Sequence, residues 1–147
     1  MAKRKSTQVK VGDILLGGGA PVTVQSMLST PSTDIPGSVA QAKALEQAGC
    51  EILRAAVPDM AAVKLISALK EAVSMPIVAD IHFDYRLALA CCDAGVDKIR
   101  INPGNIGEDS RVKAVAQAYR AKNIPIRIGV NDGSLEKHIL AKYGHPT

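Results

Sequence analysis

Gln47-Ala-Gly-Cys-Glu-Ile-Leu-Arg54 recurs in altered form as Asp93-Ala-Gly-Val-Asp-Lys-Ile-Arg100, 46 positions further along the chain. In both stretches a helical pattern stops at a glycine, an acidic residue follows, and an apolar strand then leads to an arginine. A second pair, Met75–His82 and Ile124–Asn131, lies 49 positions apart. A unit of two strands and two helices therefore repeats, and the chain is a series of βα units.

Apolar periodicity predicts a short hairpin over residues 8–16 and then five core strands that alternate with helices. A Gly17–Gly19 turn leads into the first core strand, Pro21–Met27, and the later strands are expected near 52–57, 77–82, 98–102 and 126–131. Helices are expected near 36–48, 60–73 and 84–94, then from 109 onward with Val112, Val115, Ala116 and Tyr119 inward, and from about 134 to 144. Such alternation favours a parallel sheet with right-handed crossovers.

The polarity of alternate strand residues separates two architectures, a doubly wound open sheet and a TIM (β/α)₈ barrel. Each of the last four strands has one apolar face and one face that becomes polar toward its C-terminal end. Both faces of a doubly wound sheet lie under helices and are apolar. A barrel carries helices only outside, and its interior opens at the C-terminal mouth where ligands bind. The pattern favours the α/β barrel.

The length of the chain indicates an incomplete barrel. A complete barrel takes about 250 residues and eight strands, whereas this chain has 147 residues and about five βα units. Five strands leave two open edges. We therefore expect residues 1–147 to be the N-terminal portion of a substrate-binding barrel, with the remaining strands absent. A domain-swapped or partner-completed barrel is the alternative.

Composition limits the classes of partner. Apolar residues make up 47% and charged residues 22% of the chain, which is typical of a globular domain. The net charge is +4, but the only dense basic run is Lys3–Lys5, and four aromatic residues leave little for base stacking, so no nucleic-acid partner is expected. No apolar run is long enough to span a membrane, and no signal-peptide core follows the N-terminus, so we expect a cytoplasmic protein. The three cysteines have no metal-binding spacing and are expected to be buried, reduced thiols.

Three arginines on the polar strand faces give the strongest functional signal. Arg54, Arg100 and Arg127 all lie on the inner face of their strands, near the C-terminal ends. An unpaired buried guanidinium costs several kcal/mol, and Asp80 is the only carboxylate on the inner face of the last four strands. One acid cannot neutralise three arginines, which favours an anionic ligand. The planar guanidinium suits phosphate or diphosphate because it donates two bonds at once.

Further polar residues end the same strands. His82 follows Asp80 by two positions and faces the same mouth, where it could transfer a proton or bind a phosphate oxygen. Both residues are candidates for a catalytic role. Asn102 and Asn131 are candidates for substrate binding, although each also suits a turn before the sequences Pro103-Gly104 and Asp132-Gly133.

Several longer motifs together resemble one enzyme family. Ala79-Asp-Ile-His-Phe-Asp-Tyr-Arg86, Arg100-Ile-Asn-Pro-Gly-Asn-Ile-Gly107, and Ile126-Arg-Ile-Gly-Val-Asn131 followed by Gly133-Ser-Leu-Glu-Lys137 are similar to the 4-hydroxy-3-methylbut-2-enyl diphosphate synthases, the GcpE family. Val24–Met27 and Lys142–Thr147 also fit, so the resemblance covers essentially the whole chain.

The resemblance implies an oxidoreductase of non-mevalonate isoprenoid biosynthesis. It would convert 2-C-methyl-D-erythritol 2,4-cyclodiphosphate to the hydroxymethylbutenyl diphosphate, using flavodoxin or ferredoxin as electron donor. The family combines a TIM barrel with a C-terminal domain whose [4Fe–4S] cluster is held by three cysteines and a glutamate, and it forms homodimers. The cluster ligands lie outside this chain, so no metal ligand is assigned within residues 1–147.

By the same resemblance, site roles carry over position by position. Arg54, Arg100 and Arg127 match diphosphate-binding arginines of the family. The residues that match barrel-mouth positions near the substrate are His82, Asn102 and Asn131, with Asp80 beside them. Two other hypotheses stay open: a stand-alone anion-binding module that completes its barrel by self-association, and a phosphate-handling barrel related to pteroate synthases.

Overall fold

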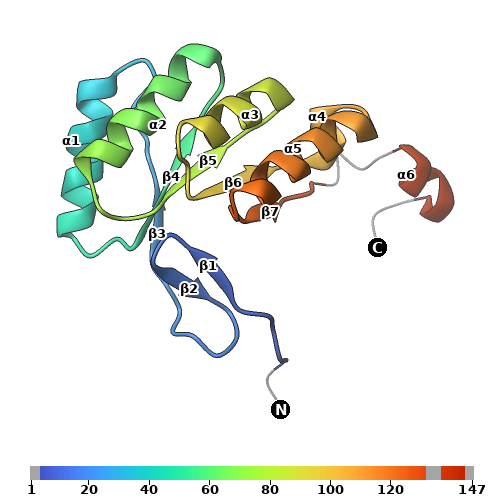
Figure 1. Ribbon diagram of the computed structural model, residues 1–147, viewed down its shortest axis with the longest axis horizontal. Helices are drawn as coiled ribbons and strands as arrows, with labels where there is room; N and C mark the ends of the chain where they lie inside the picture. The colour runs from blue at the N-terminus through green and yellow to red at the C-terminus, as the bar shows by residue number, and fades with distance from the viewer. Residues whose placement is uncertain (1–3, 132–136, 145–147) are drawn as a thin grey trace.

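The protein, for which a computed structural model describes residues 4–131 and 137–144, contains two sheets (Figure 1). The antiparallel hairpin pairs β1 (Val9–Val11) with β2 (Ile14–Leu16). The second sheet is parallel and has the order β3-β4-β5-β6-β7. Its strands are β3 (Gln25–Met27), β4 (Ile52–Ala56), β5 (Ile77–Asp80), β6 (Lys98–Ile101) and β7 (Ile126–Ile128).

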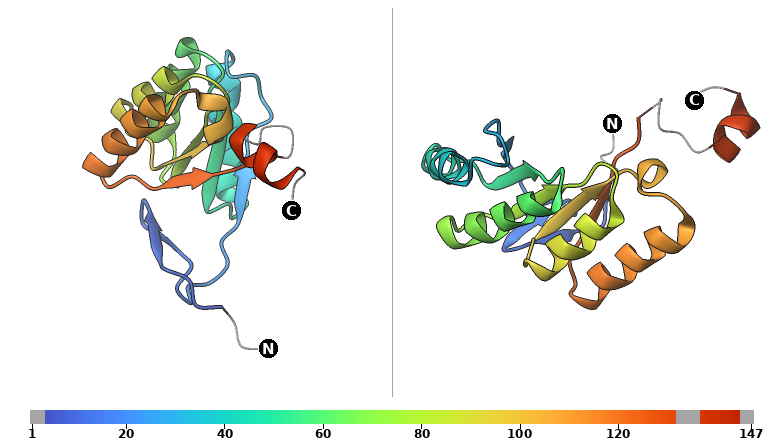
Figure 2. Two further views of the ribbon diagram at one scale, coloured as in Figure 1. Left: turned by 90° about the vertical axis from the view of Figure 1, so that its right-hand side faces the viewer. Right: turned by 90° about the horizontal axis from the view of Figure 1, so that it is seen from above.

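Four long helices connect these strands and cover one face of the sheet (Figures 1 and 2). They are α1 (Ile35–Gln47), α2 (Met60–Ala72), α3 (Tyr85–Asp93) and α5 (Asp109–Ala121). Two short helices, α4 (Pro103–Ile106) and α6 (Lys137–Tyr143), follow β6 and β7. None of the described helices is long and apolar enough to cross a membrane.

The order of the strands confirms the barrel and excludes the doubly wound sheet. A doubly wound sheet reverses its strand order at a switch point and carries helices on both faces. Here the spatial order equals the chain order, and the long helices lie on one face. The described residues therefore form an incomplete (β/α)₈ barrel of five parallel strands.

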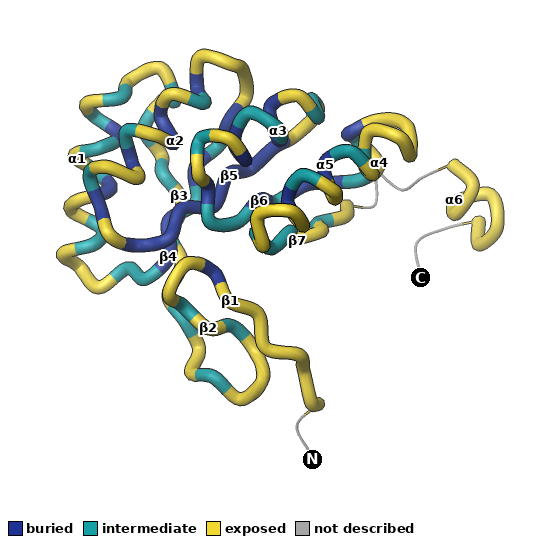
Figure 3. The backbone as a smooth tube through the Cα atoms, viewed as in Figure 1, coloured by how far each residue is buried: buried dark blue, intermediate teal, exposed yellow. Residues whose placement is uncertain are grey.

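On β4, β5 and β6 the inward and outward faces also agree with the sequence pattern. On β7, at the sheet edge, Ile128 and Val130 were expected on the apolar face but are 64% and 53% exposed. The main apolar core lies between the sheet and the helices, where the buried positions of β4–β6 are dark in Figure 3. Its strand residues are Leu53, Ala55, Ile77, Ala79, Ile99 and Ile101. Helix starts and ends fit the predicted signals too: Asp59 caps α2 by accepting from Ala62 N at 2.9 Å, and Gly49 and Gly95 end their helices at φ values of 98° and 84°.

Several elements differ from the sequence expectation. β3 covers only Gln25–Met27 rather than Pro21–Met27, and Val22 is 96% exposed. β3 is an edge strand of the described sheet and pairs only with β4. The backbone groups on its other side therefore have no neighbouring strand with which to form hydrogen bonds. On α5 the predicted inward residue Ala116 is exposed. Residues 132–136 and 145–147, which include the predicted start of the last helix at Ser134, lie outside the described residues.

The acidic residue of the repeated sequence has the same structural role in both copies. Glu51, just before β4, accepts a hydrogen bond from Val24 N at 3.1 Å. Asp97, just before β6, accepts from Ile77 N at 2.8 Å and from Lys70 Nζ at 2.8 Å. Each carboxylate thus joins the start of its own strand to the start of the preceding strand. These bonds align the strands, and with them the arginine that each strand carries toward its C-terminal end.

Candidate functional site

The polar ends of the strands meet at the C-terminal edge of the sheet, as expected for a barrel mouth. In the β-ladder Asp80 is paired with Arg100, and Arg100 with Arg127, so these three residues lie level on neighbouring strands. Arg54 lies one pleat lower, level with Val78. Side chains at alternate positions of a strand share a face, so Arg54 points to the same side as the other three.

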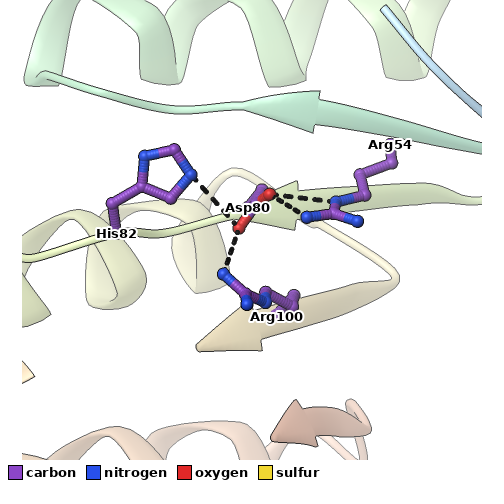
Figure 4. Close-up of polar contacts among 4 residues, drawn as sticks. All are labelled: Arg54, Asp80, His82 and Arg100. Atoms are coloured by element: carbon purple, nitrogen blue, oxygen red, sulfur yellow. Dashed lines mark hydrogen bonds and ion pairs between the residues drawn. The ribbon is translucent and has the colours of Figure 1, made fainter. Parts of the chain in front are cut away.

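Asp80 is the centre of the cluster (Figure 4). Its carboxylate is 1% exposed and uses both oxygens. Oδ2 accepts from Arg54 Nε at 2.9 Å and also from Arg54 Nη2, while Oδ1 lies 3.4 Å from Arg100 Nη1. The two guanidinium groups are only 23% and 17% exposed, so solvent screens these contacts weakly. One buried acid therefore holds two arginines in place.

His82 lies beyond the end of β5, whereas the sequence placed it inside the strand. Its Nε2 is 3.6 Å from Asp80 Oδ1, and its side chain is 46% exposed (Figure 4). That distance suits an ion pair if the imidazole is protonated. The structure thus brings together His82, Asp80, Arg54 and Arg100 as the sequence predicted, with His82 on the solvent side of the group.

Positive charge exceeds negative charge on this inner face. Arg127 is exposed, and within residues 4–131 and 137–144 no carboxylate lies within ion-pair distance of it. Lys98, on the same face of β6, is a fourth cation that received no role from the sequence. Burial lowers the pKa of Lys98, and the charges of Arg127 and Arg54 lower it further. The described inner face thus has four cationic side chains and one carboxylate.

The two candidate asparagines are placed differently. Asn102 is buried, and its Oδ1 accepts from Gly104 N at 3.1 Å, which makes it the N-cap of α4. That short helix was not predicted from the sequence, although a proline directly after an asparagine is a helix-start signal. Asn131 lies past the end of β7 and is exposed. The capping contact of Asn102 corresponds to the turn-forming interpretation, which the sequence left open.

Comparison with known proteins decides the family. The family model described as the GcpE TIM-barrel domain matches residues 6–147, nearly the whole chain. The chain belongs to the GcpE family. The expectation from its motifs is confirmed, and so is the barrel fold that they implied.

Two GcpE relatives with high sequence identity to the chain have the same name. The chain is 56% identical, over 99% of its length, to the 4-hydroxy-3-methylbut-2-en-1-yl diphosphate synthase (flavodoxin) of Vibrio vulnificus, strain YJ016. It is 57% identical over 98% of its length to the protein of the same name from Listeria monocytogenes serovar 1/2a. In both cases the chain spans 39% of the relative's length.

Solved structures with a similar fold include dihydropteroate synthases. The enzyme from Xanthomonas albilineans in complex with 7,8-dihydropteroate has a TM-score of 0.67 at 19% sequence identity, covering 93% of this GcpE chain and 54% of that protein. The enzyme from Burkholderia cenocepacia gives a TM-score of 0.57 at 17% identity, covering 86% of this chain and 64% of the other. At such low identity the likeness supports the barrel fold alone.

The described part of this GcpE chain does not fit an iron–sulfur cluster. Among residues 4–131 and 137–144 no group of three His, Cys, Asp or Glu side chains could hold a metal ion. Cys91 and Cys92 are buried in α3, and Cys50 is only half-buried, contrary to the expectation that all three are buried. Burial raises the pKa of the Cys91 thiol to about 12, which keeps it protonated rather than a thiolate ligand.

Proposed function

We propose that this chain forms the substrate-binding part of a 4-hydroxy-3-methylbut-2-enyl diphosphate synthase, and that its barrel mouth holds the diphosphate of 2-C-methyl-D-erythritol 2,4-cyclodiphosphate. The observation that carries the proposal is the charge imbalance on the inner face. Arg54, Arg100, Arg127 and Lys98 face a single described carboxylate, Asp80. A dianionic or trianionic group at this place would offset the surplus charge.

In this proposal each side chain has a separate task. Arg127 has no carboxylate partner among the described residues and donates to the outer phosphate, and Arg100, level with it on β6, donates to the inner phosphate. Arg54 supports the phosphate from one pleat below. Asp80 orients the two arginines that it contacts. His82 donates from the solvent side to a phosphate oxygen or delivers a proton, and Asn102 and Asn131 border the same mouth.

The redox part of the activity is proposed to depend on groups outside the described residues. A [4Fe–4S] cluster would supply electrons, and it would be reduced by ferredoxin or by flavodoxin, which is part of the relatives' names. None of the described side chains forms a ligand set for the cluster, so we assign it no ligand here. A homodimer, a cytoplasmic location, and the absence of nucleic-acid or membrane partners stay predictions.

A binding experiment tests the proposal directly. Isothermal titration of the full gene product with inorganic pyrophosphate should show binding that weakens about tenfold or more in each of the variants Arg54→Lys, Arg100→Lys and Arg127→Lys. A lost charge-assisted hydrogen bond is worth about 1.5–3 kcal/mol, and 1.4 kcal/mol is tenfold. The matched control is Arg111→Lys on α5, whose guanidinium lies 5.3 Å from the Tyr85 ring centre rather than on the inner face. Equal affinity in all five proteins would refute the proposal.

The self-associating module is the second candidate, and the two strand edges support it. β3 and β7 each pair with a single neighbour in the described sheet, so a second copy could add strands there. Sedimentation of the 147-residue chain separates the two ideas. A folded dimer that binds pyrophosphate would favour the module, whereas a monomer or an unfolded chain would favour the part of a longer enzyme.

A further inference from the structure

Gly129 faces the guanidinium of Arg100 across the strand ladder. It directly follows β7, and its N–H donates to Ile101 O at 2.9 Å, so the pairing with β6 continues to this residue. Gly129 shares the inner face of β7 with Arg127. A Cβ atom built on Gly129 would lie 2.6 Å from Arg100 Nε, 2.7 Å from Nη2 and 3.0 Å from Cζ.

These distances define which side of the guanidinium faces the glycine. Both nitrogens would be closer to the added Cβ than the central carbon is, so the group points its Nε–Nη2 edge at Gly129. The opposite nitrogen, Nη1, lies 3.4 Å from Asp80 Oδ1. The space left by the missing side chain of Gly129 therefore accommodates the Nε–Nη2 edge of Arg100, while Nη1 stays near Asp80.

The backbone does not require glycine here. Gly129 is not among the residues with a positive φ, unlike the helix-ending Gly49 and Gly95. A residue with a side chain could adopt this conformation without strain. The role of Gly129 is thus one of space, and the atoms that a methyl group would meet belong to the flexible end of a side chain rather than to the backbone.

We propose that Gly129 is a positioning residue of the anion site: its lack of a side chain leaves the space in which the Arg100 guanidinium stands beside Asp80, level with Arg127. The inference rests on the proposed function. A methyl group at position 129 would overlap the Nε–Nη2 edge and push the guanidinium away from its place beside Asp80. This displacement moves the donors of Arg100 out of position in the mouth and leaves the fold intact.

The test is a double-mutant cycle on the full gene product. Gly129→Ala, Arg100→Lys and the double variant are compared with the wild type in pyrophosphate affinity and in thermal unfolding. Val130→Ala is the matched control, because Val130 is the next residue and lies on the other face of the strand. We expect Gly129→Ala to weaken binding about tenfold, the equivalent of one charge-assisted hydrogen bond. Its unfolding temperature should stay close to that of Val130→Ala.

The cycle identifies the route of the effect. If Gly129 acts through Arg100, Gly129→Ala should weaken binding less than about threefold once residue 100 is lysine, which has no guanidinium for a methyl group at position 129 to displace. Additive losses would overturn the inference, and so would unchanged affinity of Gly129→Ala beside a weakened Arg100→Lys. An unfolded Gly129→Ala protein would also overturn it, because only a flexible side chain has to move. Equal affinity of wild type and Arg100→Lys would instead refute the role that the proposed function gives to Arg100.

Discussion

The Asp80→Asn substitution tests whether one carboxylate holds the site together. Asp80 is 1% exposed and contacts Arg54 through Oδ2 and Arg100 through Oδ1. An asparagine of nearly the same size keeps one acceptor oxygen, but it turns the other position into a donor that faces a guanidinium. Breaking a fully buried ion pair by removing one partner costs about 3–5 kcal/mol. Because the two guanidinium groups are 23% and 17% exposed, we expect about 2–3 kcal/mol, a reduced share of that range.

Urea unfolding of the full gene product, followed by circular dichroism, measures this loss. The matched control is Asp84→Asn. Asp84 forms a two-bond ion pair with Arg86, at 3.1 Å to Nε and 3.0 Å to Nη2, but that arginine is 70% exposed. Exposed ion pairs contribute little to stability, and asparagine keeps the N-cap bond that Asp84 accepts from Arg86 N. The control should therefore unfold at nearly the same urea concentration as the wild type.

A second measurement on the same variant separates an anion site from a structural ion pair. Saturating pyrophosphate should stabilise both the wild type and Asp80→Asn, because an anion beside Arg54 and Arg100 offsets their positive charge with or without Asp80. If Asp80→Asn unfolds like Asp84→Asn, Asp80 does not hold the cluster. If pyrophosphate stabilises neither protein, the cluster is a structural network with no anion to bind.

Three further outcomes follow from the remaining contacts. Tyr119→Phe removes the bond from the tyrosine hydroxyl to Ala88 O, 2.7 Å long, that joins α5 to α3, and should lower the free energy of unfolding by about 1 kcal/mol in urea titrations. Burial raises the pKa of Cys91 to about 12, so this thiol should resist a thiol reagent at pH 8. Between about pH 9 and 12 the thiol loses its proton in the unfolded chain but keeps it in the folded protein. Its contribution should therefore make the stability measured by calorimetry fall as the pH rises. Lys98→Met should raise the unfolding temperature at low salt, because burial and two arginines disfavour the charged lysine in the fold, and should weaken pyrophosphate binding.

The architecture was predictable because it is encoded by local signals that recur. The glycine stops, the Asp59 cap and the alternation of apolar and polar strand residues each act over a few positions, and each has its expected place in the structure. The lengths of β3 and β7 were not predictable in this way. Whether an edge segment continues as strand depends on a neighbouring strand to pair with, which is a tertiary property rather than a local one.

The grouping of the candidate residues was predicted, but their contacts were predicted only in part. Side-chain parity placed Arg54, Asp80 and Arg100 on one face, and the structure brings these three together. Parity could not show that Asp80 reaches two arginines at once, because that depends on the register between β4, β5 and β6. Lys98 also lies on the inner face of its strand, two residues before Arg100, but nothing else in the sequence marked it as a member of the cluster.

The position of Gly129 was equally hidden, since a glycine near a strand end is usually interpreted as a turn residue. Its significance depends on a distance to Arg100 that arises only when β6 and β7 are paired.

The contacts around Asp80 explain how the inner face of the barrel can carry more cationic than anionic side chains. Two of the arginines share the buried carboxylate, so neither is a fully unpaired charge. Arg127 reaches solvent, which lowers the cost of its charge. Burial and the charges of Arg127 and Arg54 lower the pKa of Lys98. The inner face thus keeps a net positive charge, and the contacts of Asp80 fix the positions of two of its arginines. If this face binds an anion as proposed, the preorganisation lowers the cost of binding, because these donors need little rearrangement.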